Sequence, residues 1–208
     1  MKSTQHHSFL KEFPLGASKT KDVLDWMRRL PLFLETEEFR AVHAAWIKPA
    51  IDDLRLKTRN GLLSEEQLIK TGRKGDALYC LAERILKGPE NRLPGEHSFN
   101  DKDGKHRFEV RFKWWSGDAQ TWRQVAMSVP DLNQIPDSPL PTNLLADIYP
   151  AGDKPVFFGH YWMSGEPELQ SANALCLDYS AGTVGPLVTY MHTSNSKKLS
   201  LKNVAIHQ

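Results

Sequence analysis

Cysteine is scarce in this sequence, and it has neither long apolar runs nor a strong charge of either sign. Cys80 and Cys176 are the two cysteines among 208 residues, so we expect no disulfide framework or zinc knuckle, and a reduced, cytoplasmic setting fits best. No stretch approaches the ~18 apolar residues of a membrane span, and the N-terminus lacks the apolar core of a signal peptide. The net charge of +2 is too small to make nucleic acid the default partner.

The remaining composition is that of an ordinary globular protein, with 40% hydrophobic and 25% charged residues. Its length suffices for one domain with a sizeable core. A capping-box pattern at residues 64–67 and an apolar helix face at 76–86 predict helices in the middle of the chain. Five prolines between residues 129 and 155 predict an extended surface connection. We therefore expect one α/β domain over residues 1–208, with a helical insertion at about 48–88.

Two segments end in a histidine directly after a short apolar strand. Residues 156–158 read as a strand that is buried on both faces, and Gly159 and His160 follow it. Residues 39–43 have the same form and end in His43, as the returning strand of a hairpin that starts near residue 32. Strand ends at the edge of an α/β sheet are where fixed side chains reach a cleft. The pair therefore predicts a metal site, although a histidine after an apolar run is more often a packed or capping residue.

Further strands are expected toward the C-terminus. Residues 174–180 predict another buried strand, residues 186–190 a strand that pairs back onto it, and residues 199–206 an edge strand. Residues 106–115 alternate between apolar and charged side chains, which predicts a half-exposed strand. Its basic face and Trp115 also admit a nucleic-acid strip, but Glu109 interrupts the charge and no RNA-binding motif accompanies it.

Several segments taken together resemble the C-terminal part of calcineurin-like metallophosphoesterases. The resemblance is greatest to bacterial enzymes similar to serine/threonine protein phosphatases and dinucleoside tetraphosphatases. It covers nearly the whole chain, and the segments occur in the same order as in the family. The segments that carry it are residues 40–46, 86–90, 101–104, 114–115, 156–162, 176–180 and 186–190.

This resemblance implies a fold, a chemistry and two ligands. The family fold is an α/β/β/α sandwich, and two divalent ions (Mn, Fe, Zn or Ni) lie at its strand ends. Carried over residue by residue, the family's late histidines become His43 and His160, both ligands of the same ion. Such a centre hydrolyses a phosphoester or phosphoanhydride by polarising the phosphoryl group and activating a hydroxide. The implied substrate is a phosphorylated small molecule, a nucleotide or a phosphoprotein.

The sequence departs from the family pattern in what it lacks. The family's Asp-x-His, Gly-Asp-x-x-Asp-Arg-Gly and Gly-Asn-His-Glu motifs supply the other ligands and the bridging carboxylate, and none of them occurs here. We therefore expect an incomplete or inactive C-terminal fragment, whose activity would need an N-terminal segment from elsewhere. The alternative is a non-catalytic binding protein derived from the same fold. Asp52, Asp53, Asp178 and His192 are available, but their spacing does not place them at the cleft.

Overall fold

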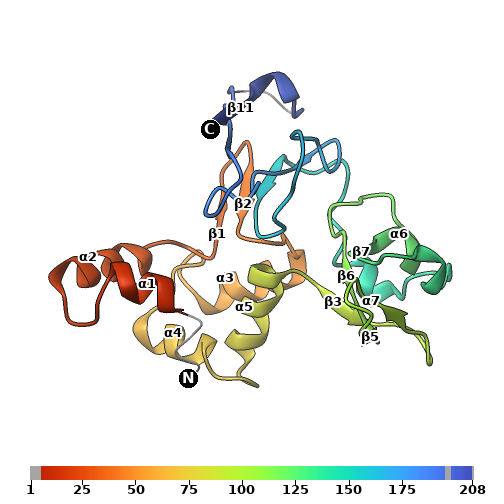
Figure 1. Ribbon diagram of the computed structural model, residues 1–208, viewed down its shortest axis with the longest axis horizontal. Coiled ribbons are helices and arrows are strands. Elements are labelled where there is room, and N and C mark those ends of the chain that lie inside the picture. The colour runs from red at the N-terminus through yellow and green to blue at the C-terminus, as the bar shows by residue number, and fades with distance from the viewer. Residues whose placement is uncertain (1–5, 195–197, 208) are drawn as a thin grey trace.

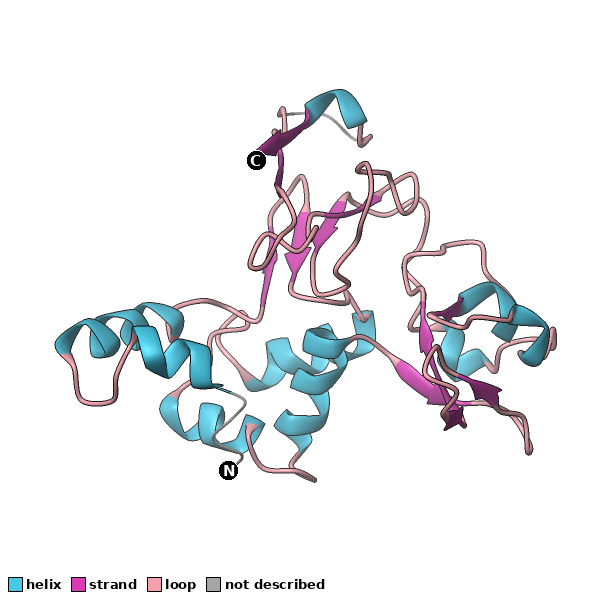
Figure 2. Ribbon diagram, viewed as in Figure 1, coloured by secondary structure: helices cyan, strands magenta, loops and turns pink. Residues whose placement is uncertain are grey.

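The computed structural model describes residues 6–194 and 198–207, where short strands and helices alternate in a mixed α/β arrangement (Figure 2). The helices are α1 (His7–Glu12), α2 (Ser18–Met27), α3 (Lys48–Lys57), α4 (Glu65–Thr71), α5 (Ala77–Lys87), α6 (Trp122–Val125) and α7 (Thr142–Leu145), with the 3-10 turns η2 (Leu132–Gln134) and η3 (Leu201–Asn203). The strands are β1 (Phe33–Glu35), β2 (Arg40–Val42), β3 (Glu90–Arg92), β4 (Phe99–Asn100), β5 (His106–Arg107), β6 (Glu109–Phe112), β7 (Ala126–Met127), β8 (Val156–Phe158), β9 (Ala174–Cys176), β10 (Leu187–Tyr190) and β11 (Val204–His207).

The central sheet has the strand order β1-β2-β8-β9 (Figure 1). Strands β1 and β2 form the predicted antiparallel hairpin, whereas β2, β8 and β9 run parallel to one another. All three residues of β8 are buried, as predicted for a strand covered on both faces. Because parallel strands end at the same edge of a sheet, the residues that follow β2, β8 and β9 come together there.

Helices α3 and α5 lie beside the central sheet and share its hydrophobic core (Figure 1). Ile51 of α3, Ile85 of α5 and Phe158 of β8 belong to one buried cluster. The backbone N–H groups of Ala44 and Ala45 donate to the Ile85 carbonyl, at 3.1 and 3.0 Å. These two hydrogen bonds fix the end of α5 against the loop that leaves β2. Three helices thus lie between residues 48 and 87, where the sequence predicts helices.

A second group of short elements lies between α5 and β8 in the sequence. It contains the β3-β6-β7 sheet, the β4-β5 hairpin and helices α6 and α7 (Figure 1). Its buried residues form a cluster of their own, in which the Trp122 ring lies edge-on to Phe112 at 5.6 Å. Trp114, which follows β6, instead packs against Phe158 in the core of the central sheet. This tryptophan therefore connects the second group to the first.

The proline-rich segment takes a different path from the predicted surface connection. Ile135, Leu140 and Tyr149 within it are only 0%, 5% and 2% exposed. The prolines prevent long regular structure, as predicted, but the apolar residues between them still turn inward. The side-chain amide of Asn173 donates to the Pro150 carbonyl at 2.9 Å, which satisfies a backbone acceptor of this segment.

Two strand predictions are also corrected. Residues 187–190 form β10, which pairs with β11 and not with β9. In the loop before β10, the Gly185 N–H donates to the Ser180 carbonyl, and this tight turn directs the chain away from β9. The alternating segment 106–115 is interrupted between β5 and β6 at Phe108, which is 38% exposed although the alternation predicts an inward position. Trp115, expected beside the charged face, is buried.

Helix α2 carries an apolar stripe but buries little of it. Trp26 and Leu30 on this stripe are 53% and 49% exposed. Ala17 is the N-cap of this helix, and the buried Thr20 hydroxyl donates to the Pro14 carbonyl before the helix. Within the described parts of the chain, no helix combines the length and the apolar character needed to cross a membrane.

Candidate functional site

The two strand-end histidines lie next to each other. His43 follows β2 directly and His160 comes two residues after β8, and these strands are parallel neighbours. Their ring centroids are 5.2 Å apart, with an angle of 63° between the ring planes. The Gly159 N–H donates to the His43 carbonyl at 2.9 Å and joins the two strand ends. The structure thus brings the predicted residues together, and their role as metal ligands stays a prediction.

Gly159 allows the strand ends to approach closely. A side-chain carbon at this position would lie 3.3 Å from Cβ of Asp178 and 3.5 Å from the His43 carbonyl oxygen. The chain then turns through the left-handed region, with φ of +75° at His160 and +50° at Trp162. This conformation costs on the order of 1 kcal/mol for a residue with a side chain. Such strain is typical of functional sites, where the surrounding structure holds a side chain in one direction.

Asp178 is the site residue that sequence reasoning missed. It comes two residues after β9, the third parallel strand, and its carboxylate accepts hydrogen bonds from the N–H groups of Ser180 at 3.0 Å and Trp162 at 3.4 Å. The carboxylate is therefore held between the loops that follow β8 and β9. The signal that identifies it is its form, since it follows a buried strand in the same way as His43 and His160 do.

Electrostatics favours the neutral form of both imidazoles. Burial lowers the pKa of His43, and the nearby charge of Asp178 opposes this effect. Burial also lowers the pKa of His160, helped by the positive charges of His43, Arg111 and Lys87 and opposed by Asp178. Because each pKa falls below the ordinary value of about 6.5, both rings keep a free lone pair at neutral pH. This is the protonation state that metal binding requires.

The donor set fits part of a metal centre. Two neutral imidazoles suit Mn, Fe, Zn or Ni, and solvent reaches His43, which leaves a route for an ion. Among the described residues, however, no group of three or more His, Cys, Asp or Glu side chains is arranged to hold an ion. The site therefore offers two nitrogen donors with a carboxylate nearby, and no bridging ligand for a second ion.

The other candidates from the sequence lie elsewhere. Asp52 forms ion pairs with Lys48 and Arg55 along α3, at 2.5 and 3.3 Å, and Asp53 is exposed on the same helix. The His192 ring lies against the Phe39 ring, with a centroid distance of 5.2 Å. Asp52 is thus engaged in ion pairs and His192 in aromatic packing, and none of the three residues belongs to the described contacts of His43 and His160.

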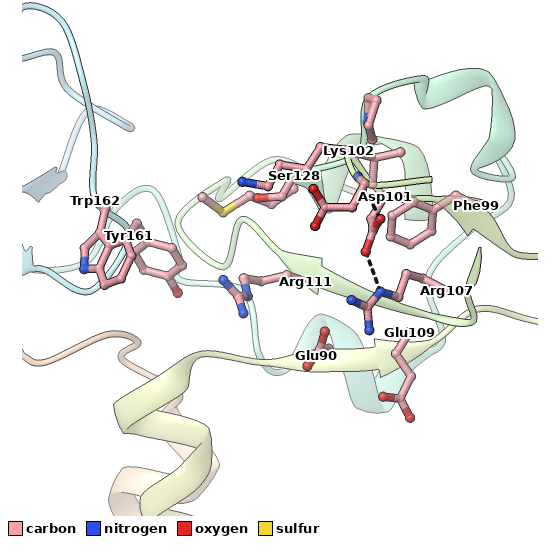
Figure 3. A pocket seen from close by; sticks show the side chains of 14 residues that line it. Glu90, Phe99, Asp101, Lys102, Arg107, Glu109, Arg111, Ser128, Tyr161 and Trp162 are labelled. Carbon is pink, nitrogen blue, oxygen red and sulfur yellow. Dashed lines mark hydrogen bonds and ion pairs between the residues drawn. The ribbon is translucent and has the colours of Figure 1, made fainter. Parts of the chain in front are cut away.

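A large open cavity begins at the two residues after His160 (Figure 3). Its volume is about 850 Å³. Tyr161 and Trp162 form one end of it, and side chains from β3, β6, the β4-β5 hairpin and residues 127–130 form the rest. In Figure 3 the guanidinium of Arg111 points from β6 toward Tyr161 and Trp162. A small molecule that binds at this end of the cavity would therefore contact the two residues that follow His160.

We compared the chain with known protein families, curated proteins and solved structures. Neither a protein-family model, nor a curated protein, nor a solved structure matches the chain.

Proposed function

We propose that this chain supplies the two-histidine part of a metal-dependent phosphoesterase centre of the calcineurin-like type. The observation that carries the proposal is the contact between His43 and His160 at the carboxyl ends of two parallel strands. Their sequence context resembles that of ligands in this family, and their lowered pKa values suit metal binding. The β1-β2-β8-β9 sheet, with α3 and α5, is then one sheet and helix layer of the family's sandwich.

The proposed reaction is hydrolysis of a phosphoester or phosphoanhydride. In such a centre a divalent ion polarises the phosphoryl group and supplies a nucleophilic hydroxide at neutral pH. The two imidazoles would hold one ion, and Asp178 would offer a negative charge near it. The bridging carboxylate and the acid for the leaving group come from a segment or chain with the motifs that this sequence lacks. Turnover therefore requires that segment, whereas binding of one ion does not.

Isothermal titration with Zn²⁺ and Mn²⁺ tests the ligand pair. We expect about one ion per chain, and an affinity that falls by at least about tenfold in His43→Ala and in His160→Ala, since even outer-shell changes often have that effect. His97→Ala is the matched control, because His97 is exposed on a different loop. Equal affinities in all four proteins would contradict the proposal.

A non-catalytic binding protein is the second candidate, favoured by the lack of a third clustered ligand in the described residues. The two candidates differ when the missing motifs are supplied. If this chain is part of an enzyme, mixing it with a polypeptide that carries those motifs should restore hydrolysis of p-nitrophenyl phosphate. If the reconstituted mixture binds two ions and stays inactive, the binding protein is the correct description. Two tightly bound ions in this chain alone would exclude the binding protein.

A further inference from the structure

Arg111 lies at the end of the cavity nearest the histidines. It is half-buried on β6, yet among the residues that the structure describes no side chain forms a hydrogen bond or ion pair with it. Glu90 lies opposite it in the strand register without forming an ion pair. Arg107 on the same cavity wall is different, since it donates to Asp101 at 2.8 Å. An unpaired guanidinium that faces a cavity is available to bind a phosphate or carboxylate.

The charges of the cavity are unevenly distributed. Arg111 is close enough to His160 to affect its ionisation, as is Lys87 at the end of α5. The carboxylates of Asp101 and Asp103 belong to the β4-β5 turn, and Asp101 is already bound by backbone N–H groups and by Arg107. Lys102 and Arg107 also line the turn, so side chains of both signs occur there, whereas none of the described carboxylates forms an ion pair with Arg111. An anion is therefore favoured at Arg111, at the end of the cavity nearest the histidines.

Trp162 provides a flat apolar surface next to this positive charge. Its side chain is 77% exposed, although large aromatic rings are usually buried, and it lines the same cavity as Arg111. The left-handed backbone at Trp162 and the contact of its N–H with Asp178 hold it beside His160. Burying this ring against a planar ligand group would remove its apolar face from water.

We propose that this end of the cavity binds a phosphorylated small molecule with a planar group, with Arg111 holding the phosphoryl oxygens beside His160 and Trp162 stacking on the planar group. This inference rests on the proposed function, which is the reason to expect a phosphoryl group at this position. The binding itself needs no metal. Within the substrates that the resemblance implies, it selects a compact aromatic or heteroaromatic phosphate over a phosphoprotein. Arg111 and Trp162 are then substrate-positioning residues.

Calorimetric titration of the metal-free chain with phenyl phosphate and with inorganic phosphate tests both contacts. We expect Arg111→Gln to weaken phenyl phosphate binding by at least about tenfold, with Arg111→Lys between it and the wild type, because lysine keeps the charge but not the forked geometry. Trp162→Ala should weaken phenyl phosphate binding and leave inorganic phosphate binding unchanged. The matched controls are Arg73→Gln and Trp26→Ala, which change exposed residues on other elements.

Three results would overturn this inference. They are a wild-type chain that binds no phenyl phosphate at millimolar concentration, an Arg111→Gln variant with unchanged affinity, and equal weakening of both ligands by Trp162→Ala. The same variants titrated with Zn²⁺ separate this inference from the proposed function. If they bind Zn²⁺ but Arg111→Gln leaves phosphate binding unchanged, the inference alone fails. If the wild-type chain binds no metal and Arg111→Gln still loses phenyl phosphate, the proposed function alone fails.

Discussion

The Glu35→Gln substitution should remove a pH-dependent part of the stability of the central sheet. Glu35 ends β1, and its carboxylate accepts hydrogen bonds from Arg40 on β2, at 2.7 Å, and from Arg55 on α3. The amino group of Lys154 lies 3.7 Å from the same carboxylate. One acid therefore connects the hairpin, the helix layer and the segment that enters β8. The glutamine variant keeps the shape of the side chain and removes its charge.

The sign of the pH dependence follows from the pKa of Glu35. Burial alone would raise this pKa, but the hydrogen bond and charge of Arg40 and the charges of Arg55 and Lys154 lower it below the ordinary value of 4.5. The ionised carboxylate thus stabilises the folded state above the unfolded pKa, and this stabilisation is lost as the pH falls through the folded pKa. The variant should be less stable at pH 7 and nearly as stable as wild type at low pH.

The expected loss at pH 7 is about 2 kcal/mol. A hydrogen bond to a charged group contributes ~1.5–3 kcal/mol, and the loss of one partner of a buried ion pair costs ~3–5 kcal/mol. The lower part of these ranges applies, because the Glu35 side chain is 23% exposed and three cations remain to be solvated. At pH 3 the difference should be smaller than at pH 7, because the carboxyl of the unfolded chain is then largely protonated and the stabilisation declines as the pH falls toward the folded pKa.

Urea unfolding followed by tryptophan fluorescence at pH 7 and pH 3 measures this free energy. Glu66→Gln is the control, because Glu66 forms an exposed ion pair with Lys70 at 2.7 Å and should change stability less. A Glu35 variant as stable as wild type at pH 7 would refute the reasoning. So would a difference of the same size at both pH values, since a shape effect does not depend on ionisation.

Three further substitutions test the packing and the buried charge. Phe158→Ala should destabilise the fold by ~3–5 kcal/mol in urea unfolding, because this ring is 3% exposed between two tryptophans, and a loss under 1 kcal/mol would contradict the assigned core. Gly88→Ala should lower the melting temperature, because φ is +82° and the added methyl would collide with the Tyr161 hydroxyl; an unchanged melting temperature contradicts this. Burial raises the pKa of Asp147 despite its ion pair with Arg84, so the wild type loses stability as the pH rises through that pKa. The melting temperature of Asp147→Asn should therefore rise relative to that of the wild type between pH 3 and pH 7. A relative fall in its melting temperature would show that the ion pair dominates.

The local signals in the sequence predicted the histidine pair. A short apolar strand that ends in a histidine occurs twice, and parallel strands bring such ends to one edge of a sheet. The capping box at residues 64–67 likewise forms as its residue types predict, with Ser64 accepting from the Gln67 N–H. These features depend on contacts within a few residues or on one general rule of sheet geometry, so a single sequence suffices to predict them.

The missed features depend on contacts that no local pattern encodes. Asp178 follows a buried strand as the two histidines do, but its position beside them depends on β9 pairing with β8 as the third parallel strand. The pairing of β10 with β11 depends on a loop that closes at Ser180, where φ is +66° in a residue type that rarely adopts it. Arg111 and Trp162, which line one cavity, are far apart in sequence and meet only in the folded chain.

The proposed ion and the proposed phosphoryl group make opposite demands on the same few residues. A divalent ion at His43 and His160 would be repelled by Arg111, whose charge already lowers the pKa of His160. A phosphoryl group at Arg111 would neutralise that charge and place oxygens beside the ion, so each ligand should bind more tightly when the other is present, by the same factor. In this scheme the negative charge of Asp178 favours the ion before the substrate arrives. A site with two imidazoles, one carboxylate and one unpaired guanidinium is thus balanced for a metal and an anion together, and less well suited to either alone.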